Sequence, residues 1–465
     1  MTELWQLSAL QLAEVIRTRH ATSRDVLQAH YDRIEKVNGA LNAVVDQMAD
    51  EAFAAADVAD RAVAEGAGLG PLHGVPLSVK ENIDVAGWAT TQGVPALAEA
   101  VAPVDAPIVE RMRAAGAIPF VRTNLPDFGL RVHTDSTLRG LTRNPWHRDV
   151  TAGGSSGGEA AALASGMSPI GLGNDIGGSL RNPAHCCGIA SIKPSTGVVP
   201  FASAIPPEDP GIMFQLMAVQ GVMARRVADV HAGFLAAAGP HDRDPTSLPV
   251  TLPPAHDRPL RVAVLTDPPG GPTDPGISGA IRGAADALTA AGHHVADAAP
   301  PGFEQAIDLW GALLIMDIAA MRPELDPVMG EGGRQFLDLA GHRLVPTDAA
   351  GWSGLFAARH RLARGWTSFF GEWDVLLSPT WAMPAFRHGA DIVSAEGAVS
   401  TLELISPVVP ANLLGLPAAV APAGVVDGLP VGAMFTAARF ADLTALAAAQ
   451  ALEDAVGVLT PIDPR

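Results

Sequence analysis

The order helix, glycine, short apolar strand recurs along this chain, and no other feature of the sequence constrains the fold as strongly. Residues 105–124 show a helical pattern that stops at Gly116 and gives way to an apolar run. Residues 260–298 show a strand, a helix and a second strand. Strands that alternate with helices build βαβ units, which pair in a sheet covered by helices. The sequence therefore predicts an α/β core rather than separate modules.

Both ends of the chain carry local signals. Residues 1–65 show apolar residues at helical spacing, which predicts N-terminal helices. Residues 415–435 show two strand-like runs around Asp427-Gly428, a dipeptide typical of a hairpin turn. A final helix fits residues 442–456.

Length and composition bound the class of protein. A chain of 465 residues with 48% hydrophobic and 17% charged residues suits a soluble enzyme with a sizeable core. The net charge of −18, without a dense basic run, argues against a nucleic-acid partner. We find neither a leader pattern nor an apolar run of about 20 residues, so we expect no membrane partner.

The only two cysteines are neighbours. Because Cys186 and Cys187 are adjacent, they cannot form the framework of a disulfide-rich secreted domain, and they fit a cytoplasmic protein. His185 precedes them, but two adjacent thiols and one imidazole lack the spacing of zinc ligands. We expect these side chains to pack in the core, and we predict no metal site.

A glycine-rich loop spans residues 152–166 and allows three interpretations. Glu159 follows Gly158, where a phosphate-binding loop would have lysine, which argues against that interpretation. Ser156 is the centre of a G-x-S-x-G pattern, but the residues before it are polar, whereas a nucleophile elbow follows a buried strand. We therefore expect Ser156 to begin a helix. The third interpretation is a scaffold that brings a serine hydroxyl close to another reactive group.

A second serine lies in a different context. Ser179 follows an apolar run and a Gly177-Gly178 pair, whose N–H groups can turn toward its hydroxyl and form an oxyanion hole. The alternative is a turn in which Ser179 caps the following helix. A serine nucleophile also needs a base. Lys80 ends an apolar run at 75–79, where burial would lower its pKa, although a solvated charge or a histidine base stays an alternative.

Three motifs together resemble the amidase signature family. They are Lys80 in "GVPLSVKENIDVAG", Ser155 in "AGGSSGGEAA" and Ser179 in "GNDIGGSLRNPA". The resemblance implies that Ser179 is the nucleophile, that Ser155 bridges it to Lys80 through a cis peptide bond, and that Lys80 is the base. It also implies a single α/β/α domain around a large mixed twisted sheet covered by helices. The implied oxyanion donors are the N–H groups of residues Ile176, Gly177, Gly178 and Ser179.

The resemblance covers most of the chain and divides one domain, 1–465, into parts. These are the N-terminal helices (1–65), the catalytic signature core (71–200), the substrate-pocket and variable helical region (201–400) and the C-terminal return to the core (401–465). Ser156, Asp175 and Arg181 match motif positions that support the loops. The sequence departs from the family at Asn174, where Ser or Thr is frequent, and at Ser191, where Gly is common.

The implied reaction is hydrolysis of a carbon–nitrogen amide bond through an acyl-enzyme. It needs no cofactor, and its rate should rise toward alkaline pH because a protonated Lys80 cannot accept a proton. The expected substrates are small or aryl amides, with carbamates (urethanes) and esters as further candidates. A homodimer is a further expectation. Apolar residues in stretches 204–221 and 309–321 are candidates for the pocket, with core packing as the alternative. They are Met213, Phe214, Met217 and Met316.

Two other functions stay open. One branch of the family transfers ammonia from glutamine within a tRNA-dependent complex and uses a tyrosine near its glutamine site, whereas the only tyrosine here is Tyr31. The other alternative is a noncatalytic binding protein of a larger complex. The intact Lys80, Ser155 and Ser179 argue against that alternative.

Overall fold

The computed structural model describes residues 3–206, 209–341 and 347–465. Two residues of the predicted pocket stretch, 207 and 208, lie outside the described residues. One mixed sheet of 11 strands runs through the molecule. In sheet order its strands are β1 (Val44–Gln47), β3 (Ile118–Thr123), β2 (Pro76–Lys80), β6 (Ile170–Asp175), β8 (Val219–Ala224), β7 (Ala190–Lys193), β12 (Ala418–Val426), β13 (Leu429–Ala437), β11 (Val375–Pro379), β9 (Arg261–Val264) and β10 (His294–Asp297).

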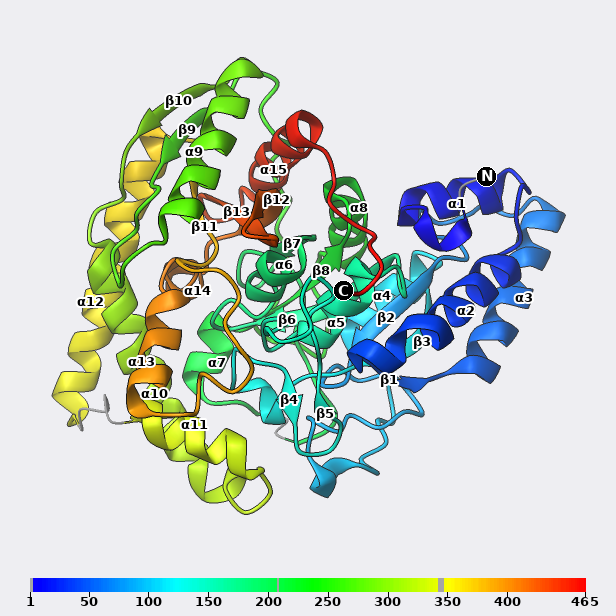
Figure 1. The fold of residues 1–465 in the computed structure, drawn as a ribbon, viewed down its shortest axis with the longest axis horizontal. Helices are drawn as coiled ribbons and strands as arrows, with labels where there is room; N and C mark the ends of the chain where they lie inside the picture. The colour runs from blue at the N-terminus through cyan, green and yellow to red at the C-terminus, as the bar shows by residue number, and fades with distance from the viewer. Residues whose placement is uncertain (1–2, 207–208, 342–346) are drawn as a thin grey trace.

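Helices cover both faces of this sheet, which confirms the predicted single α/β domain (Figure 1). Strand β12 shows why two layers form, since Ala418 and Val420 join one hydrophobic cluster and Ala419 and Ala421 join the other. The helices are α1 (Ala9–Arg17), α2 (Ser23–Leu41), α3 (Ala49–Glu65), α4 (Pro107–Ala114), α5 (Gly157–Ala164), α6 (Arg181–Cys187), α7 (Ile212–Met217), α8 (Val227–Ala237), α9 (Pro275–Ala290), α10 (Phe303–Leu325), α11 (Glu331–Gly341), α12 (Ala349–Glu372), α13 (Ala395–Leu404), α14 (Val409–Leu414) and α15 (Asp442–Val456).

The sheet is parallel where it carries the predicted site. Strand β2 lies between β3 and β6 and is parallel to both, and β6 continues into the rest of the sheet through antiparallel β8. The carboxyl ends of β2 and β6 therefore meet at one edge, where ligands bind in α/β sheets. A separate small sheet pairs β4 (Asp135–Ser136) with β5 (Gly140–Leu141).

The chain's two ends form as predicted. Strands β12 and β13 are a hairpin whose turn residues Asp427 and Gly428 have φ of 50° and 81°, the left-handed backbone that a two-residue turn requires. Helices α1, α2 and α3 lie at one side of the molecule, beside β1, and β9, β10 and α12 lie at the opposite side (Figure 1). Within the described ranges, no helix is long and apolar enough to cross a membrane.

Candidate active site

Lys80 is the last residue of β2, and its side chain is completely buried. Burial lowers the pKa of its ammonium group to about 7, although the charges of Asp175 and Glu159 oppose that shift. Above neutral pH the side chain is therefore largely an uncharged amine. A buried amine of this kind accepts a proton, which an ordinary surface lysine does not.

Two polar atoms contact the Lys80 amine. Its Nζ lies 2.7 Å from Ser155 Oγ and 2.6 Å from Asn174 Oδ1, and Asn174 comes from the adjacent strand β6. The amide oxygen of Asn174 only accepts hydrogen bonds, so it must take an N–H of the lysine. With that N–H engaged, the lone pair of a neutral amine is available to the Ser155 hydroxyl.

The loop that carries Ser155 is closely packed. The Gly154–Ser155 peptide bond is cis. A Cβ on Gly154 would lie 2.5 Å from the carbonyl carbon of Val132, so only glycine fits there. The next serine, Ser156, precedes the first residue of α5, as expected for a residue that begins a helix, and it is buried.

Asp175 and Arg181 hold the loop that carries Ser179. Both side chains are completely buried, and Arg181 donates from Nε and Nη2 to the two Asp175 oxygens at 3.0 and 2.9 Å. Burial alone would raise the pKa of the Asp175 carboxyl, but the charge and hydrogen bonds of Arg181 hold it well below its usual range. Asp175 also accepts from the N–H of Leu180 at 3.1 Å, which fixes the loop on both sides of Ser179.

The backbone donors of this loop differ from the prediction at one position. The N–H of Gly178 donates to Asp175 Oδ1 at 2.9 Å, so we remove Gly178 from the candidate oxyanion donors. The N–H groups of Ile176, Gly177 and Ser179 have no acceptor among the described residues. These three N–H groups are therefore the candidates that remain for the oxyanion site.

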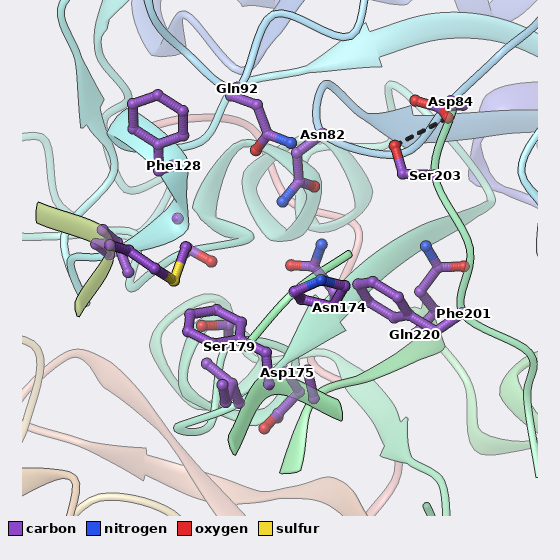
Figure 2. Close-up of a pocket in the computed structure, with 18 of the residues that line it drawn as sticks. Asn82, Asp84, Gln92, Phe128, Asn174, Asp175, Ser179, Phe201, Ser203 and Gln220 are labelled. Carbon is purple, nitrogen blue, oxygen red and sulfur yellow. Dashed lines mark hydrogen bonds between the residues drawn. The ribbon is translucent and has the colours of Figure 1, made fainter. Parts of the chain in front are cut away.

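Ser155 and Ser179 both line one cavity of about 150 Å³. Its walls carry several polar side chains, and the amides of Asn82 and Asn174 point toward the same space (Figure 2). Within the described parts of the chain, Gln220 Oε1 and Asn82 Oδ1 are buried without a hydrogen-bond partner. Unpartnered buried acceptors of this kind fit a ligand that brings N–H groups.

A second cavity, of about 350 Å³, meets the first at Ser179. It lies among α10, α11, α13 and α14, and its lining is mostly apolar. Representative residues are Leu314, Ile315, Ile318, Phe336 and Leu337. Ser179 thus lies where the two cavities meet.

The structure corrects the predicted pocket residues. Of the four, only Phe214 lines the cavity at Ser155 and Ser179. Met213 and Met217 are completely buried in the core because they lie on the inner face of the short helix α7. Met316 lines neither of the two cavities, whereas Met321, one turn and a residue further along α10, lines the first.

Sequence reasoning missed further residues of the site. Asn174 was noted only as a departure from the family, although its place directly before Asp175 at a strand end was a usable signal. Trp310 of α10 donates from Nε1 to the carbonyl of Ile176 at 3.0 Å. No local pattern predicts that contact, because the two residues are 134 positions apart.

Comparisons with known proteins agree with these observations. The Amidase family model matches residues 25–446. The chain is 38% identical over 462 residues to an indoleacetamide hydrolase of Bradyrhizobium diazoefficiens, covering 98% of this chain and 88% of that protein. It is 32% identical over 503 residues to a glutamyl-tRNA(Gln) amidotransferase subunit of Salinispora arenicola, covering 99% of each.

A solved structure of a related enzyme has a similar fold. The crystal structure of a bacterial aryl acylamidase of the amidase signature family superimposes with a TM-score of 0.83 at 29% identity, covering 98% of this chain and 97% of that one. Family model, relatives and fold agree along nearly the whole length. This chain therefore belongs to the amidase signature family and is an amide hydrolase.

Proposed function

We propose that the chain hydrolyses small aryl amides through an acyl-enzyme on Ser179, with Lys80 as base and Ser155 as proton relay. The observation that carries this proposal is the buried Lys80 amine, whose pKa is lowered to about 7 by burial and whose Nζ lies 2.7 Å from Ser155 Oγ. Ser155 in turn lines the same cavity as Ser179.

The relay moves one proton at each step. Neutral Lys80 takes the proton of the Ser155 hydroxyl as Ser155 takes that of Ser179, and Ser179 Oγ attacks the carbonyl carbon. The resulting oxyanion is bound by the N–H groups of Ile176, Gly177 and Ser179. The proton on Lys80 returns through Ser155 to the leaving nitrogen as the carbon–nitrogen bond breaks. Water then attacks the ester, and the same relay restores Ser179.

The two cavities suggest how a substrate lies. An aryl acyl group fits the larger cavity among α10, α11, α13 and α14, and the leaving nitrogen fits the first cavity, where Asn82 and Gln220 present unpartnered acceptors. A primary amide brings N–H donors to those oxygens. The relative named indoleacetamide hydrolase supports an arylacetamide as the first substrate to test. An aryl carbamate presents the same carbonyl to Ser179 and belongs to the same proposal as a secondary substrate.

The test compares wild type, Ser179→Ala and a matched control, Ser165→Ala. Ser165 is also buried, but its Oγ bonds the carbonyl of Ala161 within α5 and lines neither cavity. We expect ammonia release from indole-3-acetamide by wild type and Ser165→Ala, and a loss of about four orders of magnitude or more in Ser179→Ala. Equal rates in all three proteins would contradict the proposal.

A series of substrates distinguishes amide hydrolysis from carbamate hydrolysis and from glutamine-dependent ammonia transfer. Parallel assays with a nitroanilide amide and a nitroanilide carbamate measure the amide-to-carbamate preference. Ammonia release from glutamine alone, in preference to every aryl amide, would favour the amidotransferase function that the Salinispora relative's name indicates.

A further inference from the structure

The carbonyl groups of residues 175–178 all accept hydrogen bonds from side chains or backbone outside the turn. Asn412 Nδ2 donates to the Asp175 carbonyl at 3.3 Å, and Trp310 Nε1 donates to that of Ile176 at 3.0 Å. Asn182 serves the other two, with its Nδ2 3.0 Å from Gly177 O and its backbone N 2.6 Å from Gly178 O. The orientation of each peptide unit before Ser179 is thus set by a specific donor.

The hydrogen bond from Trp310 to the Ile176 carbonyl also determines where the Gly177 N–H points. The only cis bonds among the described residues precede Ser155 and Pro461, so the Ile176–Gly177 peptide is trans. In a trans peptide the C=O and the N–H point in opposite directions. With its carbonyl held on Trp310, this unit directs the Gly177 N–H to the side away from the indole. That N–H is one of the three without an acceptor among the described residues.

Contact between the Trp310 indole and Gly177 also restrains this peptide unit. A Cβ on Gly177 would lie 2.8 Å from Cζ2 of Trp310, so the indole rests against the glycine. Gly177 has no positive φ, and its backbone would therefore tolerate alanine. What excludes a side chain at position 177 is the indole.

We propose that Trp310 is a positioning residue that holds the Ile176–Gly177 peptide in the orientation needed to bind the oxyanion. The inference rests on the proposed function, in which Ser179 is the nucleophile. Trp310 also lines the apolar cavity. The group that orients the oxyanion donor is therefore in contact with the space assigned to the aryl acyl group.

The experiment compares Trp310→Phe with Trp366→Phe. Both tryptophans donate from Nε1 to a carbonyl, but Trp366 bonds Pro301 at 3.1 Å and lines neither cavity at Ser179. We expect Trp310→Phe to lower kcat for indole-3-acetamide about 10- to 100-fold, because misplaced donors weaken binding of the transition state selectively. KM should change by a smaller factor, which reflects the altered wall of the apolar cavity. We expect Trp366→Phe to keep the wild-type kcat even if its Tm falls.

A second readout separates positioning from structural damage. An aryl trifluoromethyl ketone forms a tetrahedral adduct with a serine, and its oxygen occupies the oxyanion site. Its affinity should fall in Trp310→Phe by about the same factor as kcat/KM. The affinity of the product indole-3-acetate, which uses the same cavity but forms no tetrahedral adduct, should fall by a smaller factor. The inference is overturned if Trp310→Phe keeps the wild-type kcat and ketone affinity, or if only KM rises.

The clash between a side chain at position 177 and the indole of Trp310 allows a third measurement. Gly177→Ala should lower kcat in the wild-type background and lower it by a smaller factor in Trp310→Phe, because phenylalanine does not reach as far toward position 177. If Gly177→Ala lowers kcat by the same factor in both backgrounds, the indole of Trp310 does not restrict position 177. Loss of the trifluoromethyl ketone adduct is expected only in Ser179→Ala, and an adduct or full activity in Ser179→Ala would overturn the proposed function rather than this inference alone.

Discussion

Two buried lysines end two strands of the same sheet, and only one of them is proposed to act as a base. Burial lowers the pKa of both Lys80, at the end of β2, and Lys193, at the end of β7, to about 7. Their neighbours differ. Lys80 contacts the hydroxyl of Ser155, whereas Lys193 Nζ donates to the carbonyl oxygens of Pro194 and Leu416, each at 2.8 Å.

The difference shows that a lowered pKa does not by itself make a base. A carbonyl oxygen only accepts hydrogen bonds, so it has no proton to give to Lys193. Ser155 has a hydroxyl proton and lines the cavity that Ser179 also lines. Burial thus makes both amines able to accept a proton near neutral pH, but only Lys80 contacts a group that has a proton to give.

The largest expected effect comes from removing each amine in turn. Lys80→Met should lower kcat/KM by about four orders of magnitude, because the relay loses its proton acceptor. Lys193→Met leaves two buried carbonyls without a donor, so it should lower the free energy of unfolding while the folded fraction keeps its activity. Rates corrected for the folded fraction, measured by circular dichroism, test this. Inactivity of a well-folded Lys193→Met would contradict the assignment of the base to Lys80 alone.

A carboxylate at position 174 should change the pKa of Lys80. Asn174→Asp keeps the side-chain shape but puts a negative charge beside Nζ, which stabilises the protonated lysine. We expect the midpoint of kcat/KM against pH to rise by about one unit or more. The variant should then be slow at neutral pH and approach the wild-type rate at high pH. An unchanged midpoint with a uniformly lower rate would indicate damage to the site instead.

Glu159→Gln should shift the midpoint of kcat/KM against pH by a smaller amount and toward lower pH. Burial raises the pKa of the Glu159 carboxyl to about 7, although Ser78 and Thr123 donate hydrogen bonds to it. The group is therefore only partly ionised when Lys80 titrates. Removing its charge should lower the midpoint of kcat/KM by less than about one unit. An upward shift would contradict the placement of charge around Lys80.

The sequence predicts the reactive residues of this site better than the residues that line its cavities. Lys80 and Ser179 follow apolar runs that become β2 and β6, and strand ends are visible in local patterns. Met213 and Met217 follow the alternative of core packing, because the sequence does not say which face of α7 turns inward. The contact of Trp310 with Ile176 depends on how α10 packs against the loop, and residues far apart in the chain set that packing.

Titration of the Lys80 amine itself tests whether this lysine is the base. The chain has only three lysines, Lys36, Lys80 and Lys193, so ¹³C labelling at lysine Cε gives few signals, and Lys80→Met and Lys193→Met assign them. We expect the Lys80 signal to titrate with a pKa of about 7, in step with kcat/KM. A Lys80 signal that stays protonated beyond pH of about 9, while kcat/KM still rises near neutral pH, would show that Lys80 is not the base.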